Sequence, residues 1–206
     1  MGILDVFRRR IGGRAGGPPI VVVSGLPRSG TSMLMRMLSA GGLDLVIDGL
    51  RTADDDNPNG YFELERVKDL DKPGDASWLA EARGKGVKVI SALLPHLPAD
   101  YDYKVVFVRR NLPEVLASQR KMLERRGEAA DAVNDDDMTA HFTAHLRRIE
   151  AQLAARPHCD VLYVEHRRAV TEPAAVAEEV GAFVGGDLDV AAMAGAVDAK
   201  LYRNRA

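Results

Sequence analysis

An uninterrupted run of β-branched residues near the start of the chain constrains the fold more than any other feature. Residues 19–24 read Pro-Ile-Val-Val-Val-Ser, and a continuous run of this kind is typical of a strand buried on both faces of a parallel sheet. The run leads into the glycine-containing stretch 25–30, and residues 31–38 then show helical apolar spacing that ends before Gly41 and Gly42. The chain is therefore predicted to open as strand, glycine loop and helix.

Strands and helices continue to alternate along the rest of the chain. Further strands are predicted at 87–90, 104–108 and 161–164, and helices at 112–126, 138–156, 172–184 and 189–197. This order indicates an α/β protein, which we expect to form a three-layer α/β/α sandwich around a parallel sheet, of the P-loop nucleotide-binding type. The 206 residues contain no interdomain linker, so we expect one domain over 18–206, preceded by a flexible basic leader over 1–17.

Composition excludes several classes of protein. Apolar residues make up 46% and charged residues 28%, which excludes wholesale disorder and a disulfide-built mini-protein. A net charge of −2 argues against a nucleic-acid partner. The single cysteine, Cys159, favours a reducing, cytoplasmic location, and the lack of a run of about 18 apolar residues argues against stable membrane insertion. Residues 128–137 carry five acids and no base, so we expect a solvated loop there.

The loop after the first strand has the frame of a phosphate-binding loop. Residues 25–32 match the Walker A motif G-x-x-x-x-G-K-[ST], except that Thr31 stands where the motif has lysine. The glycines let a tight loop point its backbone N–H groups at an anion, and the following helix adds the positive end of its dipole. Because the cation is Arg28, inside the loop, the pattern favours a phosphate-bearing ligand over ordinary triphosphate hydrolysis.

A second candidate anion site follows the predicted strand 104–108. Arg109 and Arg110 stand at its carboxyl end, and Pro113 lies near the start of the helix that follows. Cations at this end of a strand are well placed to capture an anion in an open α/β sheet. Arg110 offers a forked pair of N–H donors, and Ser118 adds a hydroxyl two turns into the helix.

The two stretches together resemble the PAPS-dependent sulfotransferases, a family with the P-loop fold, and a small bacterial-type member in particular. Their 5′-phosphosulfate loop reads P-K/R-S-G-T-[ST], and the residues that match it are Pro27, Arg28, Ser29, Gly30, Thr31 and Ser32. Their 3′-phosphate motif reads R-N/D-P-x-[DE]-x-x-x-S, which Arg110 and Ser118 match in spacing, with Pro113 displaced by one residue. The resemblance covers about residues 19–205.

The resemblance implies a function and a set of ligands. It implies that a sulfuryl group is transferred from 3′-phosphoadenosine 5′-phosphosulfate (PAPS) to an acceptor hydroxyl or amine, leaving adenosine 3′,5′-bisphosphate, without a metal. Met33 stands where many cytosolic members have a tryptophan near the adenine. Larger members clasp the 3′-phosphate with a C-terminal Arg-Lys-Gly segment, which is absent here; Arg203 and Arg205 could take that role or form a basic tail.

Candidates for catalysis come from three regions. The leaving phosphate gains charge, so cations near the bridging oxygen should count most, and Arg28 and Lys88 are the candidates. Many cytosolic members have Lys-Thr-His-Leu-Pro, with the histidine as base, whereas here Lys88 is followed by Val and Ile. For the base we choose Glu63 first, because carbohydrate and protein-tyrosine sulfotransferases use a glutamate in this region, and His96 second. The structural alternatives are a snorkelling strand lysine for Lys88 and an N-terminal acid of a helix over 64–70 for Glu63.

Two other functions remain open from the sequence alone. A P-loop small-molecule kinase is disfavoured by the missing Walker lysine, and a non-catalytic nucleotide-binding module is kept open by the missing Lys-Thr-His segment. The expected acceptor is a small molecule, a carbohydrate or a peptide, and the acidic loops suggest a polar or cationic one. His141 and His145 lack a third ligand, so we expect a solvated helix face and no metal site. The oligomeric state cannot be read from the sequence.

Overall fold

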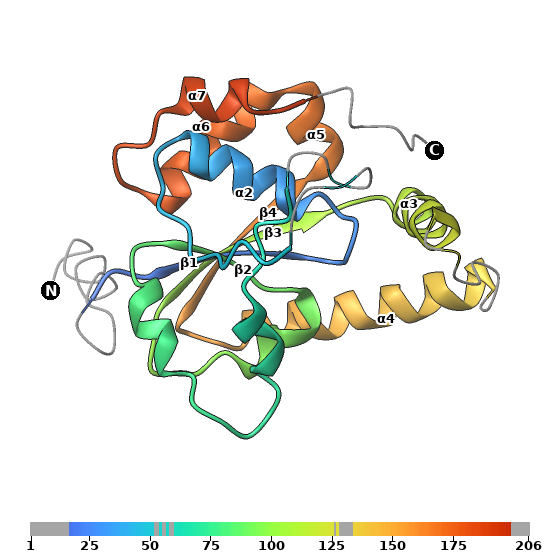
Figure 1. The fold of residues 1–206 in the computed structure, drawn as a ribbon, viewed down its shortest axis with the longest axis horizontal. Helices are drawn as coiled ribbons and strands as arrows, with labels where there is room; N and C mark the ends of the chain where they lie inside the picture. Colours follow the sequence, from blue (N-terminus) through green and yellow to red (C-terminus); the bar gives the residue numbers. More distant parts are fainter. Residues whose placement is uncertain are drawn as a thin grey trace, which may run out of the picture.

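Four parallel strands lie between two layers of helices in the computed structural model, which describes residues 17–51, 54, 57, 60–125, 127 and 134–198 (Figure 1). The strands are β1 (Ile20–Gly25), β2 (Gly86–Lys88), β3 (Tyr103–Arg109) and β4 (Cys159–Glu165), and they lie in the order β2-β1-β3-β4. All three pairings are parallel. The predicted α/β/α sandwich is confirmed. The predicted leader up to residue 16, Arg203 and Arg205 lie outside the described residues.

The helices largely follow the predicted pattern. They are α2 (Thr31–Ala40), α3 (Leu112–Arg125), α4 (Asp135–Ala154), α5 (His166–Thr171), α6 (Pro173–Val184) and α7 (Val190–Gly195), with 3₁₀ helices η1 (Glu65–Asp69), η2 (Ser77–Ala82) and η3 (Ser91–His96). The sequence did not predict α5, η2 or η3. The expected helix over 64–70 is the shorter η1.

The solvated loop predicted over 128–137 was wrong at its end. Asn134 caps α4, because its side chain accepts a hydrogen bond of 3.1 Å from the backbone N–H of Asp136. Asp135, Asp136 and Asp137 then occupy the first turn, where the helix dipole favours negative charge. The acids that suggested a loop are therefore the start of the helix.

Both faces of the sheet are covered, which accounts for the continuous apolar run in β1. Val21 and Val23 face the layer of α2, α5, α6 and α7, whereas Ile20 and Val22 face the layer that holds α4 and the 3₁₀ helices η2 and η3 (Figure 1). Side chains alternate along a strand, so a strand covered on both sides is apolar at every position. No described helix is both long and apolar enough to cross a bilayer.

Cys159 begins β4 and is buried in the α4 face of the sheet. Burial raises the pKa of its thiol to about 11, because a thiolate there would lose its hydration.

The strand order places the two predicted anion sites side by side. β2 follows β1 in the chain and pairs with one side of it, whereas β3 pairs with the other side. The direction in which successive strands join the sheet therefore reverses between β1 and β3. In open α/β sheets, ligands bind at the carboxyl ends of the strands at such a reversal. The phosphate loop follows β1 at this point, and Arg110 follows β3.

Candidate functional site

The phosphate loop ends at a helix N-terminus that no side chain of the described residues caps. Ser29 donates its backbone N–H to the carbonyl of Leu26 over 3.1 Å, which closes the turn before α2. No side chain caps α2, and its first turn carries no acid. The Oγ of Ser29 is buried and makes no hydrogen bond to any described residue. These donors, together with the helix dipole, give the loop a positive potential that suits an anion.

Gly30 of the loop packs directly on His166, the first residue of α5. A β-carbon on Gly30 would lie 2.4 Å from His166 Cδ2, and the backbone φ of +105° also favours glycine. The pKa of His166 falls to about 4, first because the ring is buried and second because the Arg110 charge is near, while Glu114 opposes the shift. A neutral imidazole therefore supports the loop. Sequence analysis missed His166, although it follows the carboxyl end of β4 just as Arg110 follows that of β3.

Arg28, Arg110 and Ser118 lie together. Arg28 Nε donates to Ser118 Oγ over 3.0 Å, and Arg110 Nη1 donates to the Arg28 carbonyl over 3.0 Å. Arg28 has a φ of +67°, in the left-handed region that non-glycine residues rarely adopt. Arg110 Nε also donates to Glu114 Oε2 over 2.9 Å, and both side chains of this ion pair are less than one-tenth exposed. Arg28, Arg110 and Ser118, which we expected at two different phosphates, thus belong to one hydrogen-bonded network.

Arg109 belongs to the other face of the sheet. Its Nη2 lies 2.8 Å from Glu150 Oε1 of α4, and its guanidinium lies 3.9 Å above the centre of the Tyr163 ring. Neighbouring residues along an extended chain point to opposite faces, so Arg109 is held against α4. Of the two arginines, Arg110 is the one that reaches the phosphate loop.

Lys88 brings a buried cation to the phosphate loop from the last position of β2. Its Nζ donates to Ser32 Oγ over 3.2 Å, to the Tyr61 carbonyl over 2.9 Å and to Glu63 Oε1 over 3.3 Å. The side chain is 10% exposed, and burial lowers the pKa of the amine, while Glu63 opposes that shift. Lys88 is therefore not a snorkelling surface lysine: all three of its N–H groups point to acceptors inside the site.

Glu63 lies between two cations. Its carboxylate accepts from Lys88 and from Arg51 Nη1, which lies 3.1 and 3.2 Å from its two oxygens. The Arg51 guanidinium lies 3.5 Å above the centre of the Tyr61 ring, and the Tyr61 hydroxyl donates to Asp54. Glu63 precedes η1 by two residues, so it is an ion-pair partner of Lys88 rather than an N-terminal acid of a helix. Sequence analysis found neither Arg51 nor Tyr61, because neither belongs to a recognisable motif.

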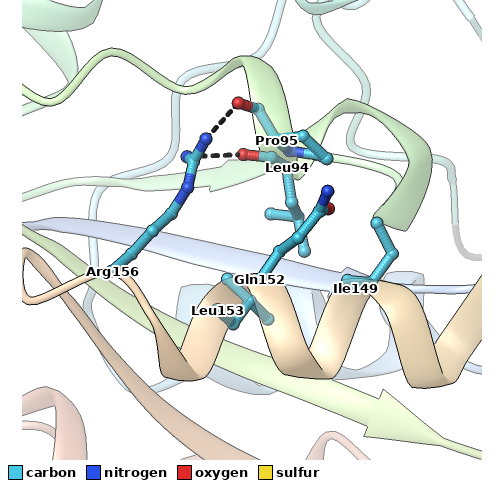
Figure 2. Close-up of a pocket in the computed structure, with 6 residues that line it drawn as sticks. All are labelled: Leu94, Pro95, Ile149, Gln152, Leu153 and Arg156. Carbon is cyan, nitrogen blue, oxygen red and sulfur yellow. Dashed lines mark hydrogen bonds between the residues drawn. The ribbon is translucent and has the colours of Figure 1, made fainter.

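His96 lies apart from this group. It is the exposed last residue of η3, and the backbone around it is anchored at the amino ends of the strands, where the Tyr103 hydroxyl donates to the Pro98 carbonyl over 2.9 Å. Figure 2 shows Arg156 donating to the carbonyls of Leu94 and Pro95, beside a depression too shallow for a small molecule. The phosphate loop lies at the opposite, carboxyl edge of the sheet.

The histidine pair of α4 is engaged in other contacts. His145 Nε2 lies 2.9 Å from Ser91 Oγ, and the His141 ring packs on Phe142. Among the residues that the structure describes, no three His, Cys, Asp or Glu side chains gather as metal ligands would.

Comparisons with known proteins identify the fold. No family model matches the sequence, and no curated protein matches it. A sulfotransferase domain of the Synechococcus PCC 7002 olefin synthase superposes with a TM-score of 0.52 at 19% identity, covering 85% of this chain and 76% of that one. A sulfotransferase from Mycobacterium tuberculosis H37Rv superposes with a TM-score of 0.57 at 17% identity, covering 93% and 73%. The chain has the sulfotransferase fold. In this sulfotransferase fold, the phosphate loop, Lys88 and Arg110 meet at the carboxyl edge of the sheet.

Proposed function

We propose that the protein transfers a sulfuryl group from PAPS to an acceptor. One observation carries the proposal: the ammonium of Lys88 lies 3.2 Å from Ser32 Oγ, at the end of the phosphate loop. A cation delivered from β2 thus takes the place of the lysine that the loop lacks at Thr31. The sulfotransferase fold and the match of residues 27–32 to the 5′-phosphosulfate pattern support the same conclusion.

The same contact argues against a kinase. In P-loop nucleotide triphosphatases, the loop Ser/Thr and an aspartate on a neighbouring strand hold Mg²⁺. Here Ser32 Oγ accepts a hydrogen bond from an ammonium, and Arg110, rather than an acid, follows β3 on the side of the phosphate loop. Positive charge therefore occupies the place where a kinase collects negative charge for its metal.

The residues of the site supply what sulfuryl transfer requires. The acceptor oxygen forms a bond to sulfur while the bond from sulfur to the bridging oxygen breaks, and the electron pair stays on the leaving phosphate. Arg28 and Lys88 would stabilise that growing charge, as donors aimed at charge that develops in the transition state. Glu63 is the carboxylate beside Lys88, and we keep it as the group that accepts the acceptor's proton.

The donor would be held at both ends. The loop amides, Thr31 and Ser32 would bind the 5′-phosphosulfate, and Arg110 and Ser118 the 3′-phosphate. Ser118 accepts from Arg28, which leaves its own O–H to donate. The roles suggested for Arg203 and Arg205 remain predictions.

A direct assay tests the proposal. The purified chain is incubated with PAPS and mixed hydroxyl and amine acceptors, and release of adenosine 3′,5′-bisphosphate is measured with and without EDTA. We expect release that EDTA does not reduce. In a parallel thermal-shift experiment, the bisphosphate should stabilise the protein by about 2.7 kcal/mol at one hundred times its dissociation constant. Stabilisation by ATP-magnesium but not by the bisphosphate would show that the proposal is wrong, and binding without any turnover of PAPS would indicate a nucleotide-binding module.

A further inference from the structure

Three large apolar side chains are exposed in the described part of the chain: Ile47, Leu50 and Ile90, at 45%, 71% and 42%. Single exposed apolar residues are normal on a protein surface and need no explanation. The positions of these three need one, because each lies within two residues of Lys88 or of a residue that bonds to Glu63.

Ile47 and Ile90 lie on the two chain segments next to Lys88, at the edge of the sheet. Leu45 forms a parallel bridge with Gly86, and Val46 donates its N–H to the Gly86 carbonyl over 2.8 Å, so this segment runs along the edge of β2. Ile47 lies two residues beyond this bridge and directly before Asp48, whose N–H donates to the Glu63 carbonyl, so the chain runs from the edge of β2 through Ile47 to Glu63. Ile90 lies two residues after Lys88, past the end of β2 and directly before η3.

Leu50 reaches the same place through the polar contacts of its neighbours. Asp48 donates its N–H to the Glu63 carbonyl over 3.3 Å, and its carboxylate accepts from the N–H groups of Leu50 and Glu65. Arg51, the next residue after Leu50, pairs with Glu63. The segment 48–51 therefore lies along Glu63, with Leu50 exposed at its edge.

The charges of the site select the reacting group. Glu63 already faces Arg51 and Lys88, and the charges of Arg28 and Arg51 both act on Lys88. An acceptor with an ammonium group would enter beside Lys88, whose own pKa burial and the charges of Arg51 and Arg28 already lower. A neutral hydroxyl meets no such repulsion and can donate its proton to Glu63.

The shape of the surroundings selects the rest of the acceptor. The exposed side chains are aliphatic, and the one described aromatic ring among these contacts, that of Tyr61, is covered by the Arg51 guanidinium at 3.5 Å. Tyr61 is itself only 4% exposed, so among the described residues of these contacts no aromatic ring is open to stack on a phenol or a sugar ring. Ligand sites commonly join apolar walls to a few polar groups in this way.

We propose that the acceptor is a neutral aliphatic alcohol, whose chain packs on Ile47, Leu50 and Ile90 and whose hydroxyl meets Glu63 and Lys88. The inference rests on the proposed sulfuryl transfer and adds the class of acceptor. In the step, the O–H proton passes to the Glu63 carboxylate, the alcohol oxygen bonds to sulfur, and the bridging S–O bond breaks to release adenosine 3′,5′-bisphosphate. The product is an alkyl sulfate.

The test is a series of acceptors with the full chain and PAPS. We measure kcat/KM for straight-chain primary alcohols from ethanol to octanol, for the matching amines, for phenol and for glucose. Burial of one methylene is worth about fourfold in binding. The value of kcat/KM should therefore rise by up to about that factor per carbon until the alkyl chain covers the apolar patch, which consists of Ile47, Leu50 and Ile90. The amines, phenol and glucose should be poorer acceptors than hexanol.

Matched variants connect the trend to the patch. Ile90→Ser and Leu50→Ser should flatten the dependence on chain length, whereas Ile90→Leu and Leu50→Met should keep it. Thermal stabilisation by adenosine 3′,5′-bisphosphate verifies that each variant is folded and binds the donor side.

The outcomes separate the two proposals. Turnover that does not depend on chain length, or that favours an amine, phenol or glucose, overturns the acceptor class and leaves sulfuryl transfer standing. No release of the bisphosphate with any acceptor overturns the proposed function, and the acceptor class with it. If Leu50→Ser instead converts a dimer into a monomer in sedimentation without changing the chain-length dependence, the patch binds a second copy and the acceptor proposal is wrong.

Discussion

Arg28 and Ser118 lie 90 positions apart in the sequence, and the Nε of Arg28 donates to the Oγ of Ser118 over 3.0 Å. The first residue comes from the loop expected to hold the 5′-phosphosulfate, and the second from the motif expected to hold the 3′-phosphate. Arg110 strengthens the link, since it donates to the carbonyl of Arg28. The two expected phosphate sites are therefore parts of one hydrogen-bonded unit, and a substitution in one should affect binding at the other.

This link predicts coupled effects on binding. Arg28→Ala and Ser118→Ala should each weaken binding of adenosine 3′,5′-bisphosphate, and the double variant should lose less than the sum of the two, with a coupling of about 1 kcal/mol. Titration calorimetry of the four proteins measures the cycle. As a control, Arg28→Ala should combine additively with Arg168→Ala, because Arg168 pairs with Glu172 and Glu179 on the exposed side of α5 and α6. Additive losses for Arg28 and Ser118 would contradict the coupling.

Arg28→Ala should impair turnover more than it impairs binding. The loop amides and the helix dipole remain to bind the 5′-phosphate, whereas the donor aimed at the leaving oxygen is lost, which typically costs about 10²–10³ in rate. Arg28→Lys should recover part of the rate, because it restores the charge without the guanidinium fork. Single-turnover transfer, measured beside direct binding, separates the two effects. Unchanged turnover would leave Lys88 as the group that stabilises the leaving phosphate.

Lys88→Met should lower the rate by about 10²-fold, since it removes a cation beside the phosphate loop. The matched control is Lys85→Met, because Lys85 precedes β2 at the amino edge of the sheet, away from the loop. Far-ultraviolet circular dichroism checks that both variants are folded. Equal effects of the two substitutions on single-turnover transfer would rule out a special role for Lys88.

Gly30→Ala should destabilise the protein more than Gly42→Ala. Both glycines have positive φ, +105° and +94°, but a β-carbon on Gly42 meets nothing within 4 Å, whereas one on Gly30 meets the His166 ring. The backbone strain of about 1–3 kcal/mol is common to both, so the difference in free energy of unfolding measures the clash. Adding His166→Ala to Gly30→Ala should recover part of the loss. Equal destabilisation by the two alanines in urea unfolding would show that the loop adapts to the ring.

Stability should fall on acidification through a window set by His166. Its pKa is about 4 in the folded protein and near 6.5 in the unfolded chain, so between these values the unfolded chain binds more protons. The free energy of unfolding should therefore decrease by up to about 1.4 kcal/mol per pH unit from pH 6.5 down to pH 4, and this contribution should level off below pH 4. Urea unfolding at several pH values tests this, with His166→Gln as the comparison. A variant with the same pH slope as the wild type would assign the dependence to other groups.

How far the sequence predicts the fold and the site depends on how local each feature is. The four strands and five of the helices follow from local apolar patterns, and the phosphate loop follows from a contiguous motif. The contacts of Lys88 with Ser32 and Glu63 join residues that are 56 and 25 positions apart in the sequence, so no motif of fixed spacing could predict them. The ion pair of Arg109 with Glu150 could not be predicted either, because it depends on which face of the sheet Arg109 occupies. His96 is followed by Leu97 and Pro98, like the histidine of the family's Lys-Thr-His-Leu-Pro segment, yet the path of η3 carries it to the other edge of the sheet.

The burial of Cys159 has a practical consequence for studying this molecule. Thiol reagents attack the thiolate, and a pKa of about 11 leaves almost none of it at neutral pH. Because the sequence contains no second cysteine, a cysteine introduced at exposed Leu50 would be the reactive position for a fluorescent or spin probe. The native thiol would not first need to be removed, so arrival of an acceptor could be followed in otherwise unaltered protein.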